Sequence, residues 1–367
     1  MSMEADFSTE NLFNQPIMFL KSGTVVAERY VITRVLGSGG MGEVYLATDQ
    51  TIPNGRPCAV KETPTPADEP PTREQYVRIR ALQMEADIMS KLHHPAIPRV
   101  FDFFPWQRRH YLVMDHIDGQ TLNDRLVAQL KEHGGGFDEP TVIGWALLIC
   151  DLFEYLHNQD PPVIHRDIKP ENFILTPQNE LRMIDYGIAR RLTDNQRITE
   201  QGTQGYAAPE SYHGYGDPRT DIYSLGAMMH ALLTGKDPRH VPLFAWDQHR
   251  ARHYRPSLSQ EIDDIIMRCL HTEMRDRWAS ARELREALLT LRQARLRAQP
   301  GTDGSRVAHI VAPSHPRGLF PGSIPRPIGK LDSDIFPMPA LAPRIAWVFE
   351  AQGPIRSSPV VRDDLVY

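Results

Sequence analysis

A glycine-rich run stands between two stretches of Val, Leu and Tyr residues that are typical of strands. Because glycine has no Cβ atom, backbone N–H groups in such a run can approach phosphate oxygens closely. A dinucleotide-binding turn or another glycine-rich hairpin would have a similar pattern, but the dinucleotide interpretation requires a helix directly after the glycines. Here the sequence predicts a strand instead. We therefore expect a phosphate-binding hairpin formed by Gly37, Ser38, Gly39, Gly40, Met41 and Gly42.

Lys61, on the following predicted strand, could supply a positive charge to phosphate oxygens. A lone lysine is most often a solvated surface residue. For phosphate binding, Lys61 would need a carboxylate partner that holds its side chain in place. The helix predicted at residues 73–92 carries Glu85 on the same face as its apolar residues. We expect Glu85 to form an ion pair with Lys61, and Glu74, at the start of this helix, is the alternative partner.

The most specific signal lies further along the chain, in three short runs of charged and polar residues. They are His165-Arg166-Asp167-Ile168-Lys169-Pro170-Glu171-Asn172, Asp185-Tyr186-Gly187 and Ala208-Pro209-Glu210. Together with the glycine run and Lys61, their order and spacing resemble the eukaryotic-type protein kinases. The resemblance covers residues 30–297. It implies a bilobal α+β fold, with a small β-rich N-lobe that contains one helix and a larger helical C-lobe.

The resemblance also implies transfer of the γ-phosphoryl group of ATP to protein Ser or Thr hydroxyls, with Mg²⁺ (or Mn²⁺) as cofactor. In this interpretation Asp167 is the catalytic base, Lys169 contacts the γ-phosphate, and Asn172 and Asp185 hold the metal. Such a set suits phosphoryl transfer, because positioned cations and a base stabilise the charge that develops on the transferring oxygens. Lys169 marks the Ser/Thr class, and so does Thr203, which would bond to both Asp167 and Lys169.

The same resemblance implies a pocket for the adenine ring of ATP. Three apolar side chains would enclose the ring, and three consecutive residues between the lobes would offer backbone groups to its edge. The apolar residues are Val44, Ala59 and Ile174, and the backbone groups belong to Asp115, His116 and Ile117.

Several conspicuous residues are better interpreted as structural. His165 is expected in the core, not as an acid or a ligand, and Tyr186 stands where related kinases usually have Phe. By the same resemblance, Asp221 would hold the backbone of the catalytic loop, and Arg277 would pair with Glu210.

Arg166, beside the catalytic Asp167, is a regulatory clue. In kinases of this type an Arg at this position usually meets a phosphate on the activation segment, which here runs over residues 185–210. Thr193 and Thr199 are the candidate phosphorylation sites. We expect autophosphorylation of one of them, in trans within a homodimer, to order the segment and raise activity.

Two other functions are compatible with parts of this pattern. A small-molecule kinase of related fold is disfavoured by Lys169 and residues 202–210, which together would shape a shelf for protein substrates. A pseudokinase scaffold would keep the fold without the chemistry. Against it, the residues needed for chemistry are intact, namely the three loop glycines, Lys61, Asp167, Asn172 and Asp185.

Composition limits the remaining possibilities. With 367 residues, 41% hydrophobic and 24% charged, the chain suits a large two-lobed domain with additional segments. A net charge of −5 without a concentrated basic stripe argues against nucleic acid as a primary partner. The 3 cysteines are far apart and predict free thiols in a reducing compartment. No secretory signal or membrane-spanning apolar stretch is visible, so we expect a cytoplasmic location.

Changes in composition along the chain predict its domains. The predicted parts are an N-terminal extension (1–28), a kinase domain (29–297, with lobes 29–117 and 118–297), a Pro-rich linker (298–344) and a C-terminal end (345–367). This end is strand-like and resembles the opening of a blade in quinoprotein-type β-propellers. A tail without structure, or one that lies on the kinase surface, is the alternative, because a propeller needs several four-stranded blades.

Residues around the motifs resemble bacterial Ser/Thr kinases of the eukaryotic type. They are Glu28-Arg29-Tyr30 before the glycine run, His94-Pro95-Ala96-Ile97-Pro98, and Asp160-Pro161-Pro162-Val163-Ile164 before the catalytic loop. One departure from the family is the stretch between Lys61 and Glu85, which is a few residues longer than usual.

Overall fold

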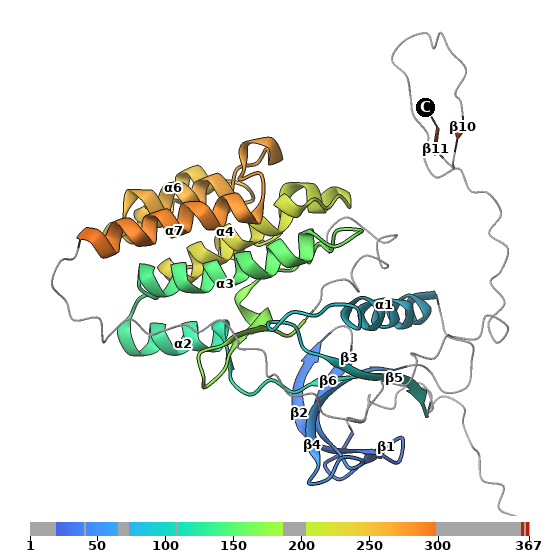
Figure 1. The fold of residues 1–367 in the computed structure, drawn as a ribbon. Helices are drawn as coiled ribbons and strands as arrows, with labels where there is room; N and C mark the ends of the chain where they lie inside the picture. Colours follow the sequence, from blue (N-terminus) through green and yellow to red (C-terminus); the bar gives the residue numbers. More distant parts are fainter. Residues whose placement is uncertain are drawn as a thin grey trace, which may run out of the picture. The chain divides into compact units, whose positions relative to one another are not determined.

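A β-rich lobe is followed along the chain by a helical lobe (Figure 1). The chain divides into two compact units, Met1–Ile328 and Gly329–Tyr367, and both lobes belong to the first. No helix within the described ranges is long and apolar enough to cross a membrane. The computed structural model describes residues 20–39, 42–64, 73–107, 109–185, 203–298, 361–362 and 365–366.

The N-lobe contains a six-stranded antiparallel sheet with the order β1-β2-β3-β4-β6-β5. Along β3 every second residue is buried, because successive side chains of a strand point to opposite faces. One face carries an apolar cluster that includes Tyr45 and Val60. The predicted β-rich lobe is thus confirmed. Its strands are β1 (Val25–Val26), β2 (Tyr30–Gly39), β3 (Gly42–Asp49), β4 (Arg56–Pro64), β5 (Val100–Trp106) and β6 (Arg109–Asp115).

The N-lobe begins before the predicted boundary at residue 29. β1 pairs antiparallel with the start of β2, and Val26 is fully buried. Further back, the backbone N–H of Leu20 donates to the hydroxyl of Tyr45, 3.2 Å away. Residues from Leu20 onward therefore pack as part of the N-lobe, with the first strand at Val25, and only residues 1–19 of the predicted extension lie outside the described structure.

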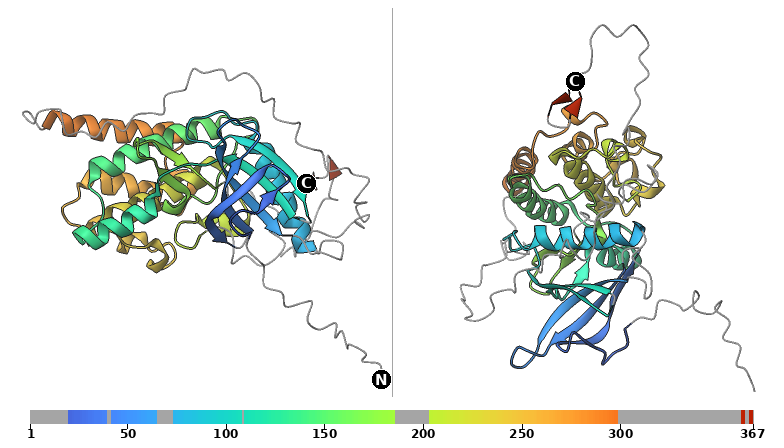
Figure 2. Two further views of the ribbon diagram at one scale, coloured as in Figure 1. Left: turned by 90° about the horizontal axis from the view of Figure 1, so that it is seen from below. Right: turned by 90° about the vertical axis from the view of Figure 1, so that its right-hand side faces the viewer.

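The helix of the N-lobe, α1 (Arg73–Met89), lies along the sheet and contacts β4, β5 and β6 (Figure 2). Its buried side chains include Leu82, Ala86 and Met89, whose spacing corresponds to one face of a helix. Glu85 lies on this buried face as well. The face that anchors α1 to the sheet therefore also brings a carboxylate towards it.

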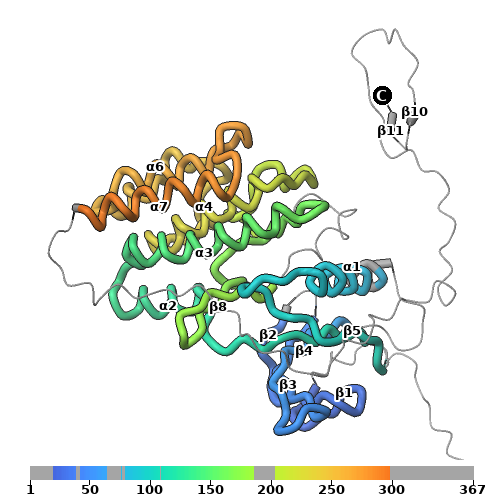
Figure 3. The backbone as a smooth tube through the Cα atoms, viewed as in Figure 1, coloured from blue at the N-terminus to red at the C-terminus, as the bar shows by residue number. Residues whose placement is uncertain are grey.

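The C-lobe is built around α4, where every residue from Thr220 to Leu233 is buried. α4 contacts α3, α6 and α7 (Figure 3), so it is buried on all sides, as expected for a central helix. It begins where the side chains of Asp217 and Thr220 form a reciprocal cap. The helices are α2 (Leu122–His133), α3 (Glu139–His157), α4 (Pro218–Thr234), α5 (Ala251–Tyr254), α6 (Gln260–Cys269) and α7 (Ala281–Ala298), with 3-10 turns η5 (Pro209–His213), η6 (Pro238–His240), η7 (Trp246–Gln248) and η8 (Met274–Asp276).

A small three-stranded sheet carries the polar loops of the C-lobe. Its strands are β7 (Gln120–Thr121), β8 (Phe173–Leu175) and β9 (Leu181–Met183), in that order. The 3-10 turn η2 (Pro170–Asn172) leads directly into β8, whereas Asp185 follows the end of β9. The N–H of Ile184 donates to the carbonyl of Asn172 at 3.0 Å. The β8–β9 hairpin therefore holds the catalytic loop beside the start of the activation segment.

The second unit contains a short antiparallel hairpin, β10 (Val361–Arg362) paired with β11 (Leu365–Val366). The other strands expected near this end, and the predicted Pro-rich linker, fall outside the described residues. A propeller is therefore not established by this hairpin.

Candidate active site

Lys61 of β4 and Glu85 of α1 form a buried ion pair. Lys61 Nζ lies 2.9 Å from both Glu85 Oε1 and Oε2, and the two residues are 7% and 1% exposed. The same ammonium group is 3.2 Å from Asp185 Oδ1. The structure thus joins three of the residues that the sequence predicts for phosphate and metal binding.

The charges of this triad support one another. Burial by itself lowers the pKa of Lys61, but the charges of Asp185 and Glu85 outweigh it and raise that pKa. Burial would raise the pKa of Asp185, yet the nearby Lys61 ammonium holds it below its usual value. The negative charge of Asp167 raises the pKa of Asp185, but less than the charge of Lys61 lowers it, so Asp185 is ionised at neutral pH. Two carboxylates close together attract a cation.

Asp167 is held in the catalytic loop by three polar neighbours. Thr203 Oγ1 donates to Asp167 Oδ1 at 2.8 Å and accepts from Lys169 Nζ at 2.9 Å. Lys169 Nζ also lies 2.9 Å from Asp167 Oδ2. Asn172 Nδ2 donates to the carbonyl and to Oδ2 of Asp167, at 2.7 and 3.1 Å. The predicted arrangement of Thr203, Lys169 and Asp167 is present in the structure.

Asp221 of α4, which is fully buried, binds the backbone of the catalytic loop. Its carboxylate accepts the backbone N–H groups of His165 and Arg166 at 2.9 and 2.8 Å. Arg166 has a φ of 67°, a conformation that is uncommon for residues other than glycine. The two hydrogen bonds hold this strained residue directly before Asp167.

His157, at the end of α3, is a further supporting residue that the sequence does not indicate. Its Nε2 lies 2.9 Å from Asp221 Oδ2. Burial would raise the pKa of Asp221, but the hydrogen bond from His157 and the other interactions of the carboxylate, among them the backbone N–H of Arg166, together outweigh burial and lower that pKa. His165 is fully buried and its Nε2 bonds to the carbonyl of Asp185, which fits a structural histidine.

A tight backbone contact positions the glycine hairpin. Residues on its two strands pair as Gly39 with Gly42 and Ser38 with Glu43, and Ser38 Oγ donates to Glu43 Oε1 at 2.9 Å. Gly42 has a φ of 129°, and a Cβ atom there would lie 1.7 Å from the carbonyl oxygen of Glu62. Only glycine fits at this point. Gly40 and Met41, at the tip, lie outside the described residues.

The residues expected around adenine come from both lobes. Ala59 belongs to the main apolar cluster and Val44 packs against it, and Ile174 of β8 is half-buried. In the connecting segment, the N–H of Asp115 donates to the carbonyl of Arg99 at 2.9 Å. That N–H is therefore already used, so the carbonyl of Asp115 is its remaining backbone group for an adenine edge. His116 and Ile117 follow as half-buried residues.

The proposed metal ligands are compatible with a divalent cation bound together with phosphate. Because Nδ2 of Asn172 bonds to Asp167, its Oδ1 atom remains available as a ligand. Asp185 adds a carboxylate. Hard oxygen donors of this kind suit Mg²⁺, which is commonly held by one or two protein ligands and substrate phosphates. Among the described residues there is no cluster of three or more His, Cys, Asp or Glu side chains that could hold a metal ion.

Arg277 and Glu210 form the architectural pair that the sequence predicts. The Arg277 Nη1 and Nη2 atoms lie 2.7 and 2.9 Å from the two carboxylate oxygens of Glu210, and Arg277 is 1% exposed. This pair fixes the end of the activation segment. Tyr186, Thr193 and Thr199, earlier in that segment, lie outside the described residues.

The protein kinase domain model matches residues 30–289, and the chain therefore belongs to the protein kinase family. It is 30% identical over 327 residues to the Ser/Thr-protein kinase PknB of Mycolicibacterium smegmatis, covering 83% of this chain and 50% of the relative. It is 33% identical over 277 residues to PknA of a Nostoc species, covering 71% and 47%. The chain spans about half the length of the curated relatives that it matches.

Solved structures agree with this family. The kinase domain of Mycobacterium tuberculosis PknI is 26% identical, with a TM-score of 0.58 over 75% of this chain and 100% of that domain. The apo form of PpkA-294 is 25% identical, with a TM-score of 0.61 over 74% of this chain and 99% of that one. The predicted bilobal kinase fold is confirmed. The bacterial relatives support the predicted resemblance to bacterial kinases.

Proposed function

We propose that this chain is an ATP-dependent protein Ser/Thr kinase. The observation that carries this proposal is the contact of the Thr203 hydroxyl with both Asp167 and Lys169. Through this contact Thr203 holds the proposed base, Asp167, next to Lys169. Thr203 itself belongs to the segment that we expect to receive a protein substrate. Among the residues that would meet ATP and the metal, the contacts of Lys61 with Glu85 and Asp185 support the proposal as well.

Each residue of the site has a role in this proposal. Lys61, held by Glu85, orients the α- and β-phosphates, and Lys169 contacts the γ-phosphate. Asp167 accepts the proton of the substrate hydroxyl as the new O–P bond forms and the bond to ADP breaks. Asn172 and Asp185 would hold the divalent metal, which neutralises charge on the phosphates.

Mg²⁺ is the metal we propose, because the available donors are a carboxylate and an amide oxygen. Mn²⁺ accepts similar ligands. Titration of each metal against the purified chain, with fluorescent ATP analogue binding as the readout, would distinguish them. Binding that requires neither metal would contradict the role of Asn172 and Asp185.

The chemistry is tested with labelled ATP and a generic basic protein, beside an Asp167→Asn variant. Removal of a general base lowers the rate by roughly 10²–10⁴. Equal labelling by the two proteins would contradict the role of Asp167. Labelling by neither would favour the alternative, a pseudokinase scaffold, and labelling of small molecules but no protein would favour a small-molecule kinase.

We also propose that phosphorylation of Thr193 or Thr199, in trans within a homodimer, activates the enzyme. Arg166 is half-buried, and its Nε atom is buried without a hydrogen-bond partner in the described part of the chain. An anion near Arg166 would satisfy it. If a variant with both threonines replaced by Ala had the same kcat and lag phase as the original, this regulation would be excluded.

Location and domain limits are part of the proposal as well. Cys58, Cys150 and Cys269 are free and buried, which supports a reducing compartment such as the cytoplasm. The β10–β11 hairpin is compatible with the start of a β-propeller after the linker. Limited proteolysis followed by mass spectrometry would test whether the kinase domain of residues 29–297, with the nine residues before it, is released as a resistant fragment.

A further inference from the structure

A row of polar residues crosses the N-lobe sheet at the base of the glycine hairpin. Ser38 of β2 pairs with Glu43 of β3, and Glu43 pairs with Glu62 of β4. Tyr111 of β6 is the next partner of Glu62. Cross-strand partners place their side chains on the same face of a sheet, whereas Lys61, one position before Glu62, points to the other face. The row therefore runs from the hairpin to β6 on the face away from Lys61.

Glu43 is buried at an unusual place for a glutamate. It directly follows Gly42 of the hairpin and is only 8% exposed, although glutamate is rarely buried unless it is paired. Its Oε1 atom accepts from Ser38 Oγ at 2.9 Å. Its Oε2 atom is buried and has no hydrogen-bond partner in the described part of the chain. Such burial costs free energy, so what Glu43 does for the hairpin explains its position better than packing does.

The carboxylate of Glu62 lies behind Glu43 and is held in place from β6. Glu62 is fully buried, and its Oε1 atom accepts from the guanidinium group of Arg109. Burial raises the pKa of Glu62 although Arg109 lowers it, and the charge of Glu43 raises it further. Acidic side chains directly opposite each other repel. This repulsion disfavours a Glu43 side chain turned towards β4 and favours the one that reaches Ser38.

The bond between Ser38 and Glu43 joins the two strands of the hairpin just before its tip. Beyond this pair both strands end in glycine, which has no side chain that could hold them together. Gly42 is fixed from the other side, because a Cβ atom there would lie 1.7 Å from the carbonyl oxygen of Glu62. Glu62 directly follows Lys61. The hairpin is thus tied at Ser38 and rests on the same part of β4 that presents Lys61.

We propose that Glu43 is a positioning residue for ATP, whose bond to Ser38 holds the two strands of the glycine hairpin together beside Lys61. This inference rests on the proposed kinase function and gives Glu43 no part in the chemistry. A hairpin that is ordered before ATP arrives loses less conformational freedom on binding, so it binds the phosphates more tightly. Loss of the bond should therefore weaken binding of ATP, whereas adenosine, which has no phosphates, should bind as before.

Two variants of the whole chain remove this bond, one from each side. Ser38→Ala removes the donor at an exposed position, so this variant should fold, and Glu43→Ala removes the acceptor. Isothermal titration with a non-hydrolysable ATP analogue and Mg²⁺ should show binding about tenfold weaker in each, as expected for a lost hydrogen bond to a charged group. Because both changes remove the same bond, the double variant should lose no more affinity than either single variant. The affinity for adenosine should change by less than about twofold in all three, since adenosine offers the hairpin no phosphate.

Glu43→Gln is the conservative variant. Its side-chain carbonyl can still accept from Ser38, so the affinity for the ATP analogue should stay within about threefold of that of the original chain. A residue that only stabilised the N-lobe would not separate the ATP analogue from adenosine in this way. Glu132→Ala, at an exposed position of α2, is the matched control and should leave both affinities unchanged.

The proposal is overturned if Ser38→Ala or Glu43→Ala binds the ATP analogue as tightly as the original chain, or if their losses add in the double variant. It is also overturned if the affinity for adenosine falls by the same factor, which would show a general distortion of the N-lobe. Phosphoryl transfer from ATP to a basic protein is measured in parallel with the original chain. The expected losses of affinity without any transfer would refute the kinase function and leave the role of Glu43 in ATP binding intact.

Discussion

Lys61 and Glu85 are joined by two 2.9 Å contacts between Nζ and the carboxylate oxygens, although they belong to a strand and a helix 24 positions apart in sequence. Both are buried. Replacing Glu85 by Gln would remove one of the two carboxylates that contact the Lys61 ammonium group in this triad and leave that of Asp185. The position of α1 and the charge of Lys61 are thus linked.

We expect Glu85→Gln to weaken binding of an ATP analogue with Mg²⁺ about tenfold or more, because the ammonium group loses the partner that orients it. Breaking a buried pair from one side also destabilises a protein by about 3 kcal/mol. Isothermal titration measures the first effect and urea unfolding the second. Glu132→Gln, at an exposed position of α2, is the control, and an affinity within twofold of the original would contradict the prediction.

Asp221→Asn should lower kcat and leave KM for ATP nearly unchanged. The charged oxygens of Asp221 hold the N–H groups of His165 and Arg166, and hydrogen bonds to a charged group contribute about 1.5–3 kcal/mol each. Without that charge, the strained backbone of Arg166 relaxes and displaces Asp167. Steady-state kinetics with varied ATP and varied peptide separate these effects. A change confined to KM for ATP would show that Asp221 acts elsewhere.

Much of this site follows from sequence because its charged residues stand in short runs with fixed order. Asp167, Lys169 and Asn172 lie within six positions, so one loop must carry all three. Lys61 and Glu85 follow from the patterns of a strand and a helix, each of which has one buried face. The contacts within these runs are short-range, and they are the ones that sequence predicts well.

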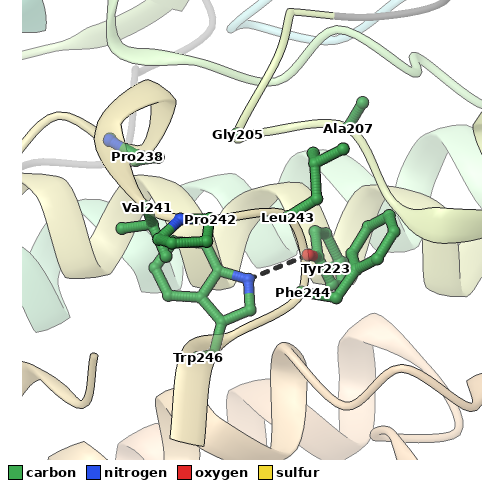
Figure 4. A pocket seen from close by; sticks show the side chains of 9 residues that line it. All are labelled: Gly205, Ala207, Tyr223, Pro238, Val241, Pro242, Leu243, Phe244 and Trp246. Atoms are coloured by element: carbon green, nitrogen blue, oxygen red, sulfur yellow. Dashed lines mark hydrogen bonds between the residues drawn. The ribbon is translucent and has the colours of Figure 1, made fainter. Parts of the chain in front are cut away.

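Some long-range contacts, such as Arg277 with Glu210, follow from the resemblance, but others, and the very short elements, follow from neither the resemblance nor local patterns. β1 has two residues, too few to show alternation, and it exists because β2 supplies its hydrogen bonds. His157 meets Asp221 across 64 positions, which no local pattern indicates. Val241 and Trp246 lie in the connection from α4 to α5, where the 3-10 turns η6 and η7 are too short to show a periodic pattern, so only packing brings these residues together (Figure 4).

Asp49 should be essential to the stability of the N-lobe. It is fully buried, and its carboxylate accepts from Arg29 Nε and Nη2 at 2.9 and 2.8 Å and from Arg56 Nη2 at 3.0 Å. Asp49→Asn should lower the free energy of unfolding by about 3 kcal/mol at pH 7, because it leaves two cations without their common partner. Asp247→Asn, at an exposed position, is the control.

The contribution of Asp49 should also depend on pH. Burial raises its pKa, but the hydrogen bonds from Arg29 and Thr51 and the charge of Arg29 together outweigh burial, so the pKa lies below the ordinary value of 3.8. A depressed carboxyl pKa means that the contribution is present above pH 3.8 and is lost as the pH falls below it. Urea unfolding at pH 7 and pH 3 should therefore show a smaller difference between Asp49→Asn and the original at pH 3. An unchanged difference would contradict this account.

Because of His230 of α4, we expect the protein to lose stability in mild acid. It is fully buried, and its Nε2 lies 2.9 Å from the carbonyl of His249. Burial lowers its pKa from 6.5 to about 4, despite the opposing effects of that carbonyl and of Asp263, while His249 lowers it further. The rings of Trp246 and Tyr254 pack edge-on against it.

Because the unfolded chain binds a proton at His230 near pH 6.5 and the folded chain only near pH 4, acid favours unfolding between these values. The free energy of unfolding should fall by about 3 kcal/mol from this residue as the pH decreases from about 6.5 to 4. A His230→Gln variant can still donate to the carbonyl of His249 but cannot titrate, so its stability should fall less over this range. Urea unfolding from pH 7 to pH 4 measures both curves, with exposed His213→Gln as the control. Parallel curves for His230→Gln and the original protein would show that His230 does not carry this pH dependence.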